Sequence, residues 1–550
     1  MTHTPQLPQR IPRSLLFLGL LGLFLFLAVQ ILPGFISPPD QENSETSAMP
    51  RVISHDDASA KAAHFAKQQF GGTTAGEAPH PVHQSDSLLY GYLAKNEKLA
   101  HFDQTYDSRF PTDTMETEVR TPSGTLFVYL HIETGKIVGW RLFPAKTDAK
   151  KKTPYYSDWS RLQLARNTAV QLGGFRLSEL QGGQVDGNQV VFRPQGYTVG
   201  DAQLTIRVTV DPLPASGQLK ALQYRAAFAV PDHYAAYIQK QKNTAAALSL
   251  YGSMLMNVLL FITAIVMAIR QRRSTSLLRG LLLTALFLAF YIVNNFNMAD
   301  GIRASYGARP DVETLTTAGI VVSNIFTVLM GIGIYFCLVG GDGIWRNSGQ
   351  RLWARYGETG YGDHVWRAMK LSYPLAFVML GTQSVLLFGL DRSIHSWSTT
   401  SVESSPYNLA LPLLYPLLAW CAAISEEAMY RLFGIAIFKK LLRKQWLAYL
   451  VPTIIWALGH VSYPVYPFYS RLVELTIVGL LFCVLFVRYG FITAVFTHAM
   501  LDTILMSFSL LQLGTPVNLL AALVYIVLPV GLAWLMRSFA NRRRAAEPVT

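Results

Sequence analysis

Ten long apolar segments constrain the fold of this 550-residue chain more than any other feature. Segments of about 17–25 apolar residues are long enough to cross a bilayer as helices. The expected spans lie near residues 14–33, 245–269, 277–297, 315–339, 371–390, 409–438, 446–462, 472–487, 491–511 and 517–536. The sequence therefore predicts an α-helical polytopic membrane protein with about ten transmembrane helices.

The composition agrees with a protein that lies partly in a membrane and partly in water. Hydrophobic residues make up 51% of the chain and charged residues only 15%. The net charge of +13 is not gathered on one domain, because the basic residues lie beside the apolar segments. A lipid bilayer is therefore the expected partner, and nucleic acid is not. The three cysteines all fall inside apolar segments, which leaves no disulfide framework for a soluble part.

The positions of the basic residues predict the orientation of the spans. Lysine and arginine are frequent in alternate loops and after the last span. The other loops hold only Arg303, Arg309, Arg392 and Arg471. Because basic loops stay in the cytoplasm, both termini are expected there, in a bacterial inner membrane, with residues 38–243 outside. The first span follows Arg10 and Arg13 and lacks a clear cleavage site, which favours a retained signal anchor over a cleaved signal peptide.

The outer segment has the pattern of a folded α+β domain rather than of a linker. Residues 126–132 and 204–210 alternate between apolar and polar side chains, which predicts strands, and residues 133–136 are typical of a hairpin turn. Residues 62–72 and 164–174 each predict a short helix closed by Gly-Gly, so the interpretation is either two small repeats or two convergent helix ends. Two such units resemble periplasmic PepSY-like modules, which often regulate or inhibit peptidases. That resemblance implies a ligand or regulator of the outer domain as a partner.

The most unusual polar residues lie in the expected span 409–438, where Glu426 and Glu427 are adjacent and Arg431 follows. An ionised side chain near the bilayer centre costs roughly 2.5–3.5 kcal/mol, so a cluster of such groups indicates a use. Residues four apart share one face of a helix, which predicts an ion pair between Glu427 and Arg431. Glu426 points about 100° away and is left as the candidate reactive group.

Two further spans bring histidines to a similar depth. From a rise of about 1.5 Å per residue, Glu426, His460, His498 and Asp502 lie roughly 20, 24, 15 and 21 Å from the basic residues at the cytoplasmic ends of their helices. His498 and Asp502 also share one helical face, because they are four residues apart. We therefore expect these side chains to meet in one pocket inside the membrane.

This combination of groups suits hydrolysis by an activated water. A carboxylate shielded from bulk water can take a proton from water, and imidazoles can hold that water or donate to a developing oxyanion. Two histidines and a carboxylate, here His460, His498 and Asp502, can equally form a zinc site with an open position. The residues alone leave open whether Glu426 or a divalent metal activates the water.

Three short motifs carry a resemblance to a known family. Glu426-Glu427-x-x-x-Arg431, Trp456-x-x-x-His460 and His498-x-x-x-Asp502 are similar to the three-part signature of the CPBP family of intramembrane proteases. This family includes the type II CAAX prenyl endopeptidases and the bacterial Abi proteins. The resemblance covers residues 370–535 and says nothing of residues 1–360.

The resemblance implies a helical intramembrane endopeptidase. It implies that Glu426 activates the water with help from His460, while His498 and Asp502 stabilise the oxyanion or help to bind a metal. Trp456 stands where Phe is common in the family, which we interpret as a tolerated aromatic exchange. Asp502 stands where Asn is frequent, and a carboxyl group donates only when protonated, which favours pairing with His498 or metal ligation.

The expected organisation has five parts. They are a cytoplasmic N-terminus with a signal-anchor helix (1–37), an extracytoplasmic α+β domain (38–243), additional transmembrane helices with a cytoplasmic loop (244–369), a CPBP-like protease core (370–537) and a basic cytoplasmic tail (538–550). The candidate catalytic residues are Glu426, Glu427, His460, His498 and Asp502, with Arg431 and Trp456 in support.

The expected function is hydrolysis of a peptide bond in a membrane protein or a lipidated peptide, which enters laterally or from the cytoplasm. Two alternatives remain. Buried ionisable groups also mark the pathways of ion- or proton-coupled transporters. In a non-catalytic receptor or scaffold, the same groups would only hold helices together, as single polar residues in spans often do. The full set of groups on three spans favours catalysis.

Overall fold

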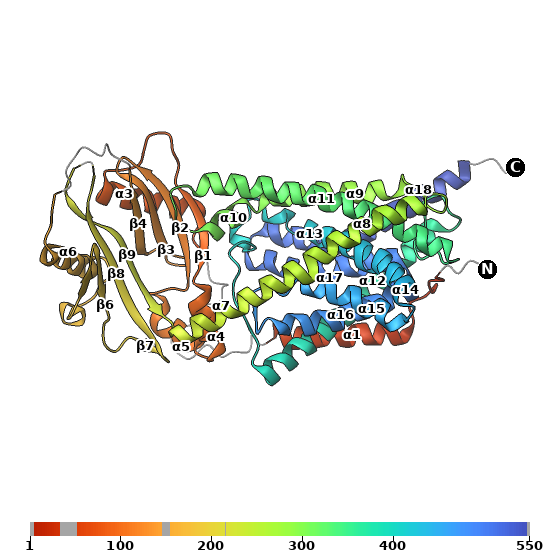
Figure 1. The fold of residues 1–550 in the computed structure, drawn as a ribbon, viewed down its shortest axis with the longest axis horizontal. Coiled ribbons are helices and arrows are strands. Elements are labelled where there is room, and N and C mark those ends of the chain that lie inside the picture. Colours follow the sequence, from red (N-terminus) through yellow and green to blue (C-terminus); the bar gives the residue numbers. More distant parts are fainter. Residues whose placement is uncertain (1–4, 33–51, 146–153, 215, 547–550) are drawn as a thin grey trace.

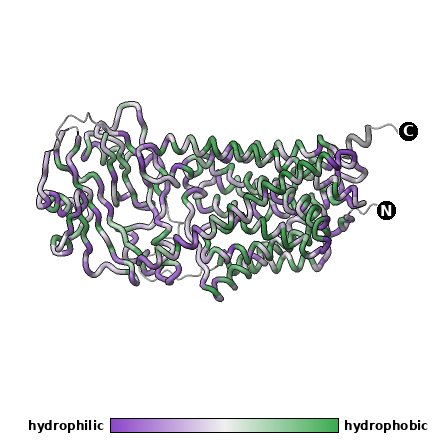
Figure 2. Tube along the Cα trace, in the orientation of Figure 1, coloured by the Kyte–Doolittle hydropathy of each residue, from purple (hydrophilic) through white to green (hydrophobic). Residues whose placement is uncertain are grey.

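The computed structural model describes residues 5–32, 52–145, 154–214 and 216–546. A sheet domain and a bundle of long helices lie end to end (Figure 1). Hydrophobic residues follow the helices of the bundle, and hydrophilic residues are frequent in the sheet domain and at the far end of the bundle (Figure 2). The junction of the expected anchor with the outer domain (33–51) and the chain ends (1–4 and 547–550) lie outside the described residues.

Eight helices among the described residues are long and apolar enough to cross a membrane. They are α1 (Arg13–Phe26) with η1 (Leu27–Ile31), α7 (Asp232–Ala247) with η4 (Leu248–Met254) and α8 (Leu255–Arg270), α9 (Arg279–Asn297), α11 (Val312–Asn347), α12 (Tyr361–Ile394), α16 (Tyr469–Tyr489), α17 (Phe491–Gln512) and α18 (Pro516–Ala546). Each overlaps one of the expected spans. The predicted class, a helical polytopic membrane protein with a separate sheet domain, is confirmed.

The other two expected spans, 409–438 and 446–462, fold as shorter or irregular helices. α13 (Leu417–Glu426) continues through the π-helical η7 (Glu427–Ile435) into α14 (Ala436–Leu442), and α15 (Gln445–Leu458) has only 14 residues. With these two, the expectation of about ten membrane helices agrees with the structure. The predicted end at residue 462 was wrong, because the helix stops at Leu458 and the chain turns from Gly459 onward.

The part of the sheet domain that the structure describes contains nine strands in one antiparallel sheet. The strands are β1 (His80–Ser85), β2 (Asp113–Thr121), β3 (Gly124–His131), β4 (Ile137–Pro144), β5 (Gln184–Asp186), β6 (Gln189–Phe192), β7 (Thr198–Val199), β8 (Ala202–Pro212) and β9 (Leu219–Ala229). Their order is β1-β2-β3-β4-β9-β8-β6-β5, with β7 paired to β8. The pairing of β4 with β9 therefore joins the early strands to the late ones.

One helix precedes each half of this sheet. α3 (His55–Phe70) packs on β1 and β2, and α6 (Asp158–Gln171) packs on β8 and β9. The strands expected at 126–132 and 204–210 lie in β3 and β8, and the expected turn joins β3 to β4, so these predictions are confirmed. One helix before each half of the sheet is the arrangement expected of two repeated units. That the two halves are repeats stays a prediction.

Short elements complete the chain between these helices and strands. They are α4 (Ser87–Lys95), α5 (Leu99–Phe102), η2 (Asp103–Asp107), η3 (Leu177–Leu180), α10 (Ala299–Tyr306), β10 (Trp397–Ser398), η5 (Pro406–Asn408), η6 (Pro412–Leu414) and β11 (Val465–Tyr466). β10 pairs with β11, which ties the segment before α13 to the segment after α15. β10 comes soon after α12, so this pair joins the end of α12 to the chain that follows α15.

Polar contacts fix the sheet domain to the bundle. Glu118 of β2 bonds Arg120 at 2.8 Å and also pairs with Arg303 of α10. His80 of β1 lies 2.7 Å from Asp300 of α10. Because Glu118 is buried, its two arginine partners offset the cost of removing its charge from water.

A continuous helix also joins the two parts. It begins at Asp232, soon after β9, and runs through α7, η4 and α8 to Arg270 without a loop. It crosses the bundle diagonally (Figure 1). Within the bundle, Asn257 of this helix accepts a hydrogen bond from the Tyr430 hydroxyl of η7 at 3.1 Å.

The first membrane helix packs against α12 through glycines. A Cβ atom on Gly22 would lie 2.2 Å from the carbonyl oxygen of Phe377, and one on Gly381 would lie 2.4 Å from the Gly22 Cα. Small residues allow helix backbones to come this close inside a membrane. The contact therefore requires glycine at both positions.

Replacing Gly22 with Ala is expected to destabilise the bundle, because the new methyl group would push α1 away from α12. Overpacking of this kind costs about 1–3 kcal/mol. Thermal unfolding of the full-length protein in detergent measures the loss. Gly389→Ala on α12 is the matched control, because nothing lies within 4 Å of its added Cβ. Equal melting temperatures for the two variants would contradict the close packing.

Candidate active site

Two helices and a turn bring the expected polar groups into one cluster. Glu426 is the last residue of α13, His498 and Asp502 lie on α17, and His460 lies in the turn after α15. Glu426 Oε1 is 3.6 Å from His460 Nε2, and Glu426 Oε2 is 3.7 Å from His498 Nε2. His498 Nε2 is also 3.4 Å from Asp502 Oδ2. The two imidazoles and the two carboxylates therefore share one small volume.

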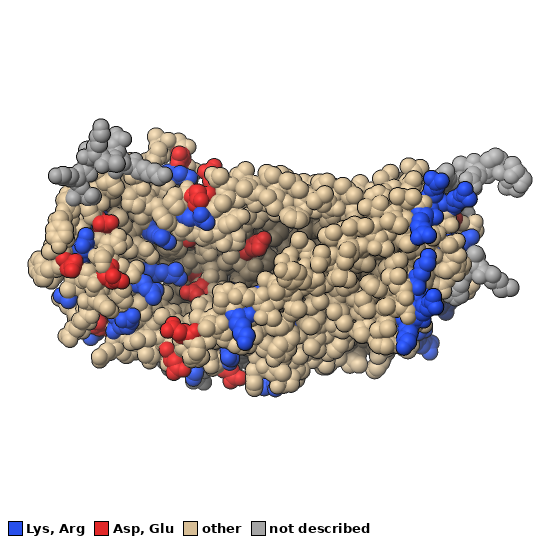
Figure 3. All heavy atoms as spheres, in the orientation of Figure 1, with Lys and Arg blue, Asp and Glu red and all other residues tan. Residues whose placement is uncertain are grey.

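The cluster is partly open. The side chains of Glu426, His460 and Asp502 are 17%, 19% and 23% exposed, whereas that of His498 is 5% exposed. Figure 3 shows that the flank of the bundle is hollowed next to the sheet domain, with acidic atoms inside the hollow. Three of the four side chains can thus meet a water molecule or a ligand without any helix moving.

Glu427 faces the protein interior instead. It is fully buried, and its Oε1 lies 3.1 Å from Nη1 of Arg431, which is also fully buried. The predicted pairing at four residues is confirmed. The Arg431 guanidinium lies 4.6 Å from the centre of the Trp456 ring and 5.1 Å from the centre of the Phe482 ring, so two aromatic rings help to stabilise the cation. The pair directs Glu427 inward and leaves Glu426 to the open side.

Glu427 also bonds His498, a contact that the sequence did not predict. His498 Nδ1 lies 2.8 Å from Glu427 Oε1. An ionised carboxylate only accepts hydrogen bonds, so Nδ1 carries the proton and Nε2 faces Glu426 and Asp502. The sequence pattern had paired His498 with Asp502 alone. Glu427 and His498 are 71 residues apart, so no local pattern predicts their contact, which depends on how α13 packs against α17.

Trp456 contributes a donor that sequence reasoning missed. Its indole N–H donates to Glu426 Oε2, and its carbonyl oxygen lies 2.9 Å from His460 Nδ1. A carbonyl oxygen accepts, so His460 carries its proton on Nδ1 and turns Nε2 toward Glu426. Phe has no N–H group, so Phe at position 456 could not donate the hydrogen bond that Trp456 gives to Glu426. The sequence shows that the indole nitrogen is a donor, but not which group accepts from it.

Another buried carboxylate of the bundle, which sequence reasoning missed, lies outside this cluster. Glu474 of α16 is fully buried and bonds Arg471 at 2.7 Å and Gln383 of α12 at 2.7 Å. Its oxygens are thus engaged by two neighbouring groups. Glu474 joins α16 to α12 and adds no group to the cluster around Glu426.

The expected metal ligands do not form a metal site in this arrangement. Among the described residues, no group of three or more His, Cys, Asp or Glu side chains is placed so that it could hold a metal ion. Within the expected set, His460 and His498 each use Nδ1 for a hydrogen bond and turn Nε2 toward the cluster. Metal assistance stays a prediction that this arrangement does not test.

The comparisons with known proteins concern this same segment. Residues 408–504 match the model of the type II CAAX prenyl endopeptidase Rce1-like family. The chain is also similar to the sporulation-killing factor biosynthesis protein SkfC of Bacillus subtilis (strain 168), with 23% identity over 272 residues. That alignment covers 48% of this chain and 51% of the relative, so the chain spans about half the length of the curated relative it matches. No solved structure matches the chain.

The matched segment contains all three motifs, from Glu426 to Asp502, and every member of the cluster around Glu426. The remainder of the chain, including the sheet domain, lies outside it. The chain is a multi-pass membrane protein, and the resemblance of its site-bearing segment to the type II CAAX prenyl endopeptidases is confirmed.

Proposed function

We propose that this protein is an intramembrane endopeptidase that hydrolyses a peptide bond of a membrane protein or a lipidated peptide. The observation that carries the proposal is the position of the Glu426 carboxylate, within 3.6 Å of His460 and 3.7 Å of His498, inside the segment that matches the family. These separations exceed a direct hydrogen bond and suit groups that share a water molecule.

Glu426 is the general base in this mechanism. Its carboxylate takes a proton from the water, whose oxygen then attacks the carbonyl carbon of the scissile peptide bond. The C–N bond of the tetrahedral intermediate breaks, and Glu426 returns the proton to the leaving nitrogen. The Trp456 indole N–H holds one carboxylate oxygen, which leaves the other to face the water and His460.

The histidines have separate roles. His460 binds the attacking water through Nε2, because its Nδ1 is engaged by the Trp456 carbonyl. His498, when protonated, donates from Nε2 to the oxyanion that develops on the substrate. Glu427 touches neither water nor substrate and is a positioning residue, since it is fully buried between Arg431 and His498. The Asp502 carboxylate, 3.4 Å from His498 Nε2, favours the protonated imidazole electrostatically.

The depth of Glu426 in the bundle follows from its position along its helix. Glu426 lies nine residues after the start of α13 and sixteen before the end of α14. From the helical rise, these are about 14 Å and 24 Å, so the site is in the half of the bundle nearer the sheet domain. Lysine and arginine gather at the opposite end (Figure 3), which supports a cytoplasmic location for that end and for both termini, in a bacterial inner membrane.

Replacing Glu426 with Gln is expected to abolish proteolysis, because an amide cannot take the proton from water. Loss of a general base lowers the rate by about 10²–10⁴-fold. Proteomic comparison of membranes that contain the wild-type or the variant protein identifies peptides shortened only by the wild type. Glu403→Gln, at an exposed carboxylate outside the cluster, is the control and should keep full activity.

The same variant separates the proposal from its alternatives. Full cleavage by the Glu426→Gln protein would contradict the endopeptidase assignment. Ion or solute uptake into proteoliposomes that disappears in this variant would support a transporter. An unchanged cellular role after loss of both His460 and His498 would support a receptor or scaffold.

Trp456→Phe is expected to slow cleavage without weakening substrate binding. The change removes the indole N–H that holds Glu426 and keeps an aromatic ring beside Arg431. A hydrogen bond to a charged group contributes about 1.5–3 kcal/mol, so kcat should fall about 10- to 100-fold with little change in KM. Trp420→Phe is the matched control, because its indole nitrogen has no hydrogen-bond partner among the described residues. Equal kcat values for both variants would show that the indole hydrogen bond does not position Glu426.

A further inference from the structure

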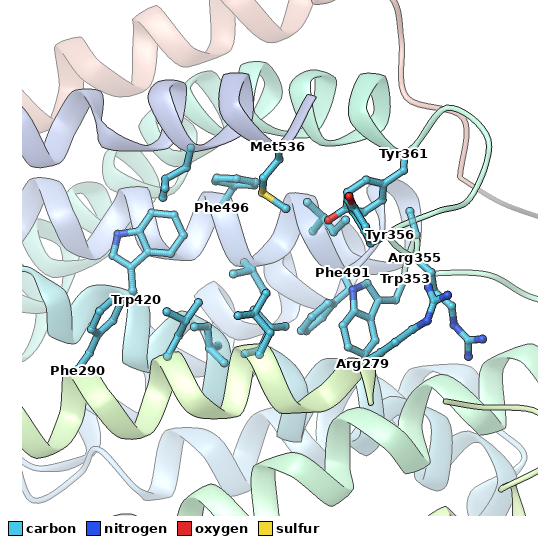
Figure 4. Close-up of a pocket in the computed structure, with 18 of the residues that line it drawn as sticks. Arg279, Phe290, Trp353, Arg355, Tyr356, Tyr361, Trp420, Phe491, Phe496 and Met536 are labelled. Carbon is cyan, nitrogen blue, oxygen red and sulfur yellow. The ribbon is translucent and has the colours of Figure 1, made fainter. Parts of the chain in front are cut away.

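A cavity of about 550 Å³ lies in the bundle, apart from the cluster around Glu426. Its walls come from α9, α13, α17, α18, the start of α12 and the loop at 353–356 (Figure 4). Cavities of roughly 300–1,000 Å³ are typical of sites for small ligands. None of the seven motif residues lines it.

The cavity is apolar along most of its length and basic at one end. Phe290, Trp420 and Phe496 lie toward one end, and Arg279 and Arg355 lie at the other (Figure 4). These two arginines are the charged residues of the described lining, which includes no carboxylate. Such a cavity suits a molecule with an apolar chain and an anionic group at its end.

The two arginines differ in how they are paired. Arg355 bonds Asp342, which also accepts from Arg346 at 2.9 Å, and Arg346 lies 3.1 Å from Glu358. Both carboxylates are thus engaged. Arg279 has no carboxylate within 4.0 Å among the described residues, and its Nη1 is buried without a hydrogen-bond partner. A buried guanidinium N–H without an acceptor is costly, and phosphate oxygens are acceptors that match its geometry.

The cavity and the catalytic cluster lie on opposite faces of the same two helices. Ile424 of α13 and Phe496 of α17 line the cavity. Glu426 and His498 each follow two residues later, which is about 200° around a helix. α13 and α17 therefore separate the cavity from the catalytic cluster. A molecule bound in the cavity is not the substrate whose peptide bond is cut.

The rim of the cavity faces the lipid side of the bundle. Two of its lining residues, Leu278 just before α9 and Leu282 on α9, are 77% and 67% exposed. In a membrane, exposed leucines at this position contact acyl chains rather than water. An acyl chain that reaches the cavity past these leucines therefore stays in an apolar environment.

We propose that this cavity binds one anionic phospholipid of the membrane. An acyl chain lies along the apolar wall, and the phosphate accepts hydrogen bonds from the Arg279 guanidinium. Anionic lipids are attracted to basic residues near the membrane surface. Arg279 is the first residue of α9 and follows the basic loop at 271–278, at the end of the bundle where lysine and arginine gather. The proposal does not depend on the proteolytic function, because none of the catalytic groups takes part.

The test measures lipid binding by the full-length protein in detergent, with dioleoylphosphatidylglycerol and dioleoylphosphatidylcholine as probes. Native mass spectrometry counts bound lipid, and the melting temperature reports stabilisation. The wild type should retain the anionic lipid in preference to the zwitterionic one. Arg279→Gln should weaken that preference about five-fold, the effect expected for one basic residue. The control is Arg272→Gln, because Arg272 is exposed in the loop before α9 and does not line the cavity. This variant should keep the wild-type preference for the anionic lipid.

Further measurements distinguish binding of a phospholipid from binding of free phosphate. Leu283 lines the cavity, and the larger side chain of Leu283→Trp would fill part of it while Arg279 stays in place. This variant should therefore also retain less lipid. If inorganic phosphate alone stabilises the wild type as much as the lipid does, the site binds phosphate and the proposal fails. Equal retention of the two lipids, or equal losses in the Arg279 and Arg272 variants, would likewise overturn it.

Discussion

The buried ion pair between Glu427 and Arg431 is the interaction on which the site depends. Neither charge meets water, so each needs a partner to offset the cost of desolvation. Arg431 also contacts two aromatic rings, and Glu427 also bonds His498. These contacts link η7 to α15, α16 and α17 at a single point. The neighbouring Glu426 is thereby turned away from the pair and toward the open side of the cluster.

The irregular helices of the bundle coincide with this cluster. Glu426 ends an α-helical stretch and Glu427 begins a π-helical one, while α15 stops two residues before His460. Irregular backbone of this kind is frequent at functional sites. The regular spans around it, such as α12 and α16, supply the packing that holds it in place. α13 and α17 in turn separate the polar cluster from the apolar cavity on their other face.

Much of the fold follows from patterns along the chain. Apolar length predicts the spans, and alternation predicts β3 and β8, because each signal is local. The Glu427–Arg431 pair follows from helical spacing for the same reason. The contacts of His498 with Glu427 and of Trp456 with Glu426 could not be predicted, because they depend on how separate helices are rotated against one another. The pairing of β4 with β9 is likewise set by the folded sheet and not by any short pattern.

The unbroken helix from Asp232 to Arg270 has a mechanical consequence. A flexible loop would absorb movement of the sheet domain, whereas a helix transmits it as a tilt or rotation of its whole length. Asn257, well inside the bundle, bonds Tyr430 only four residues from Glu426. Any displacement of the sheet domain that tilts this helix is therefore carried directly to the segment that bears the carboxylates.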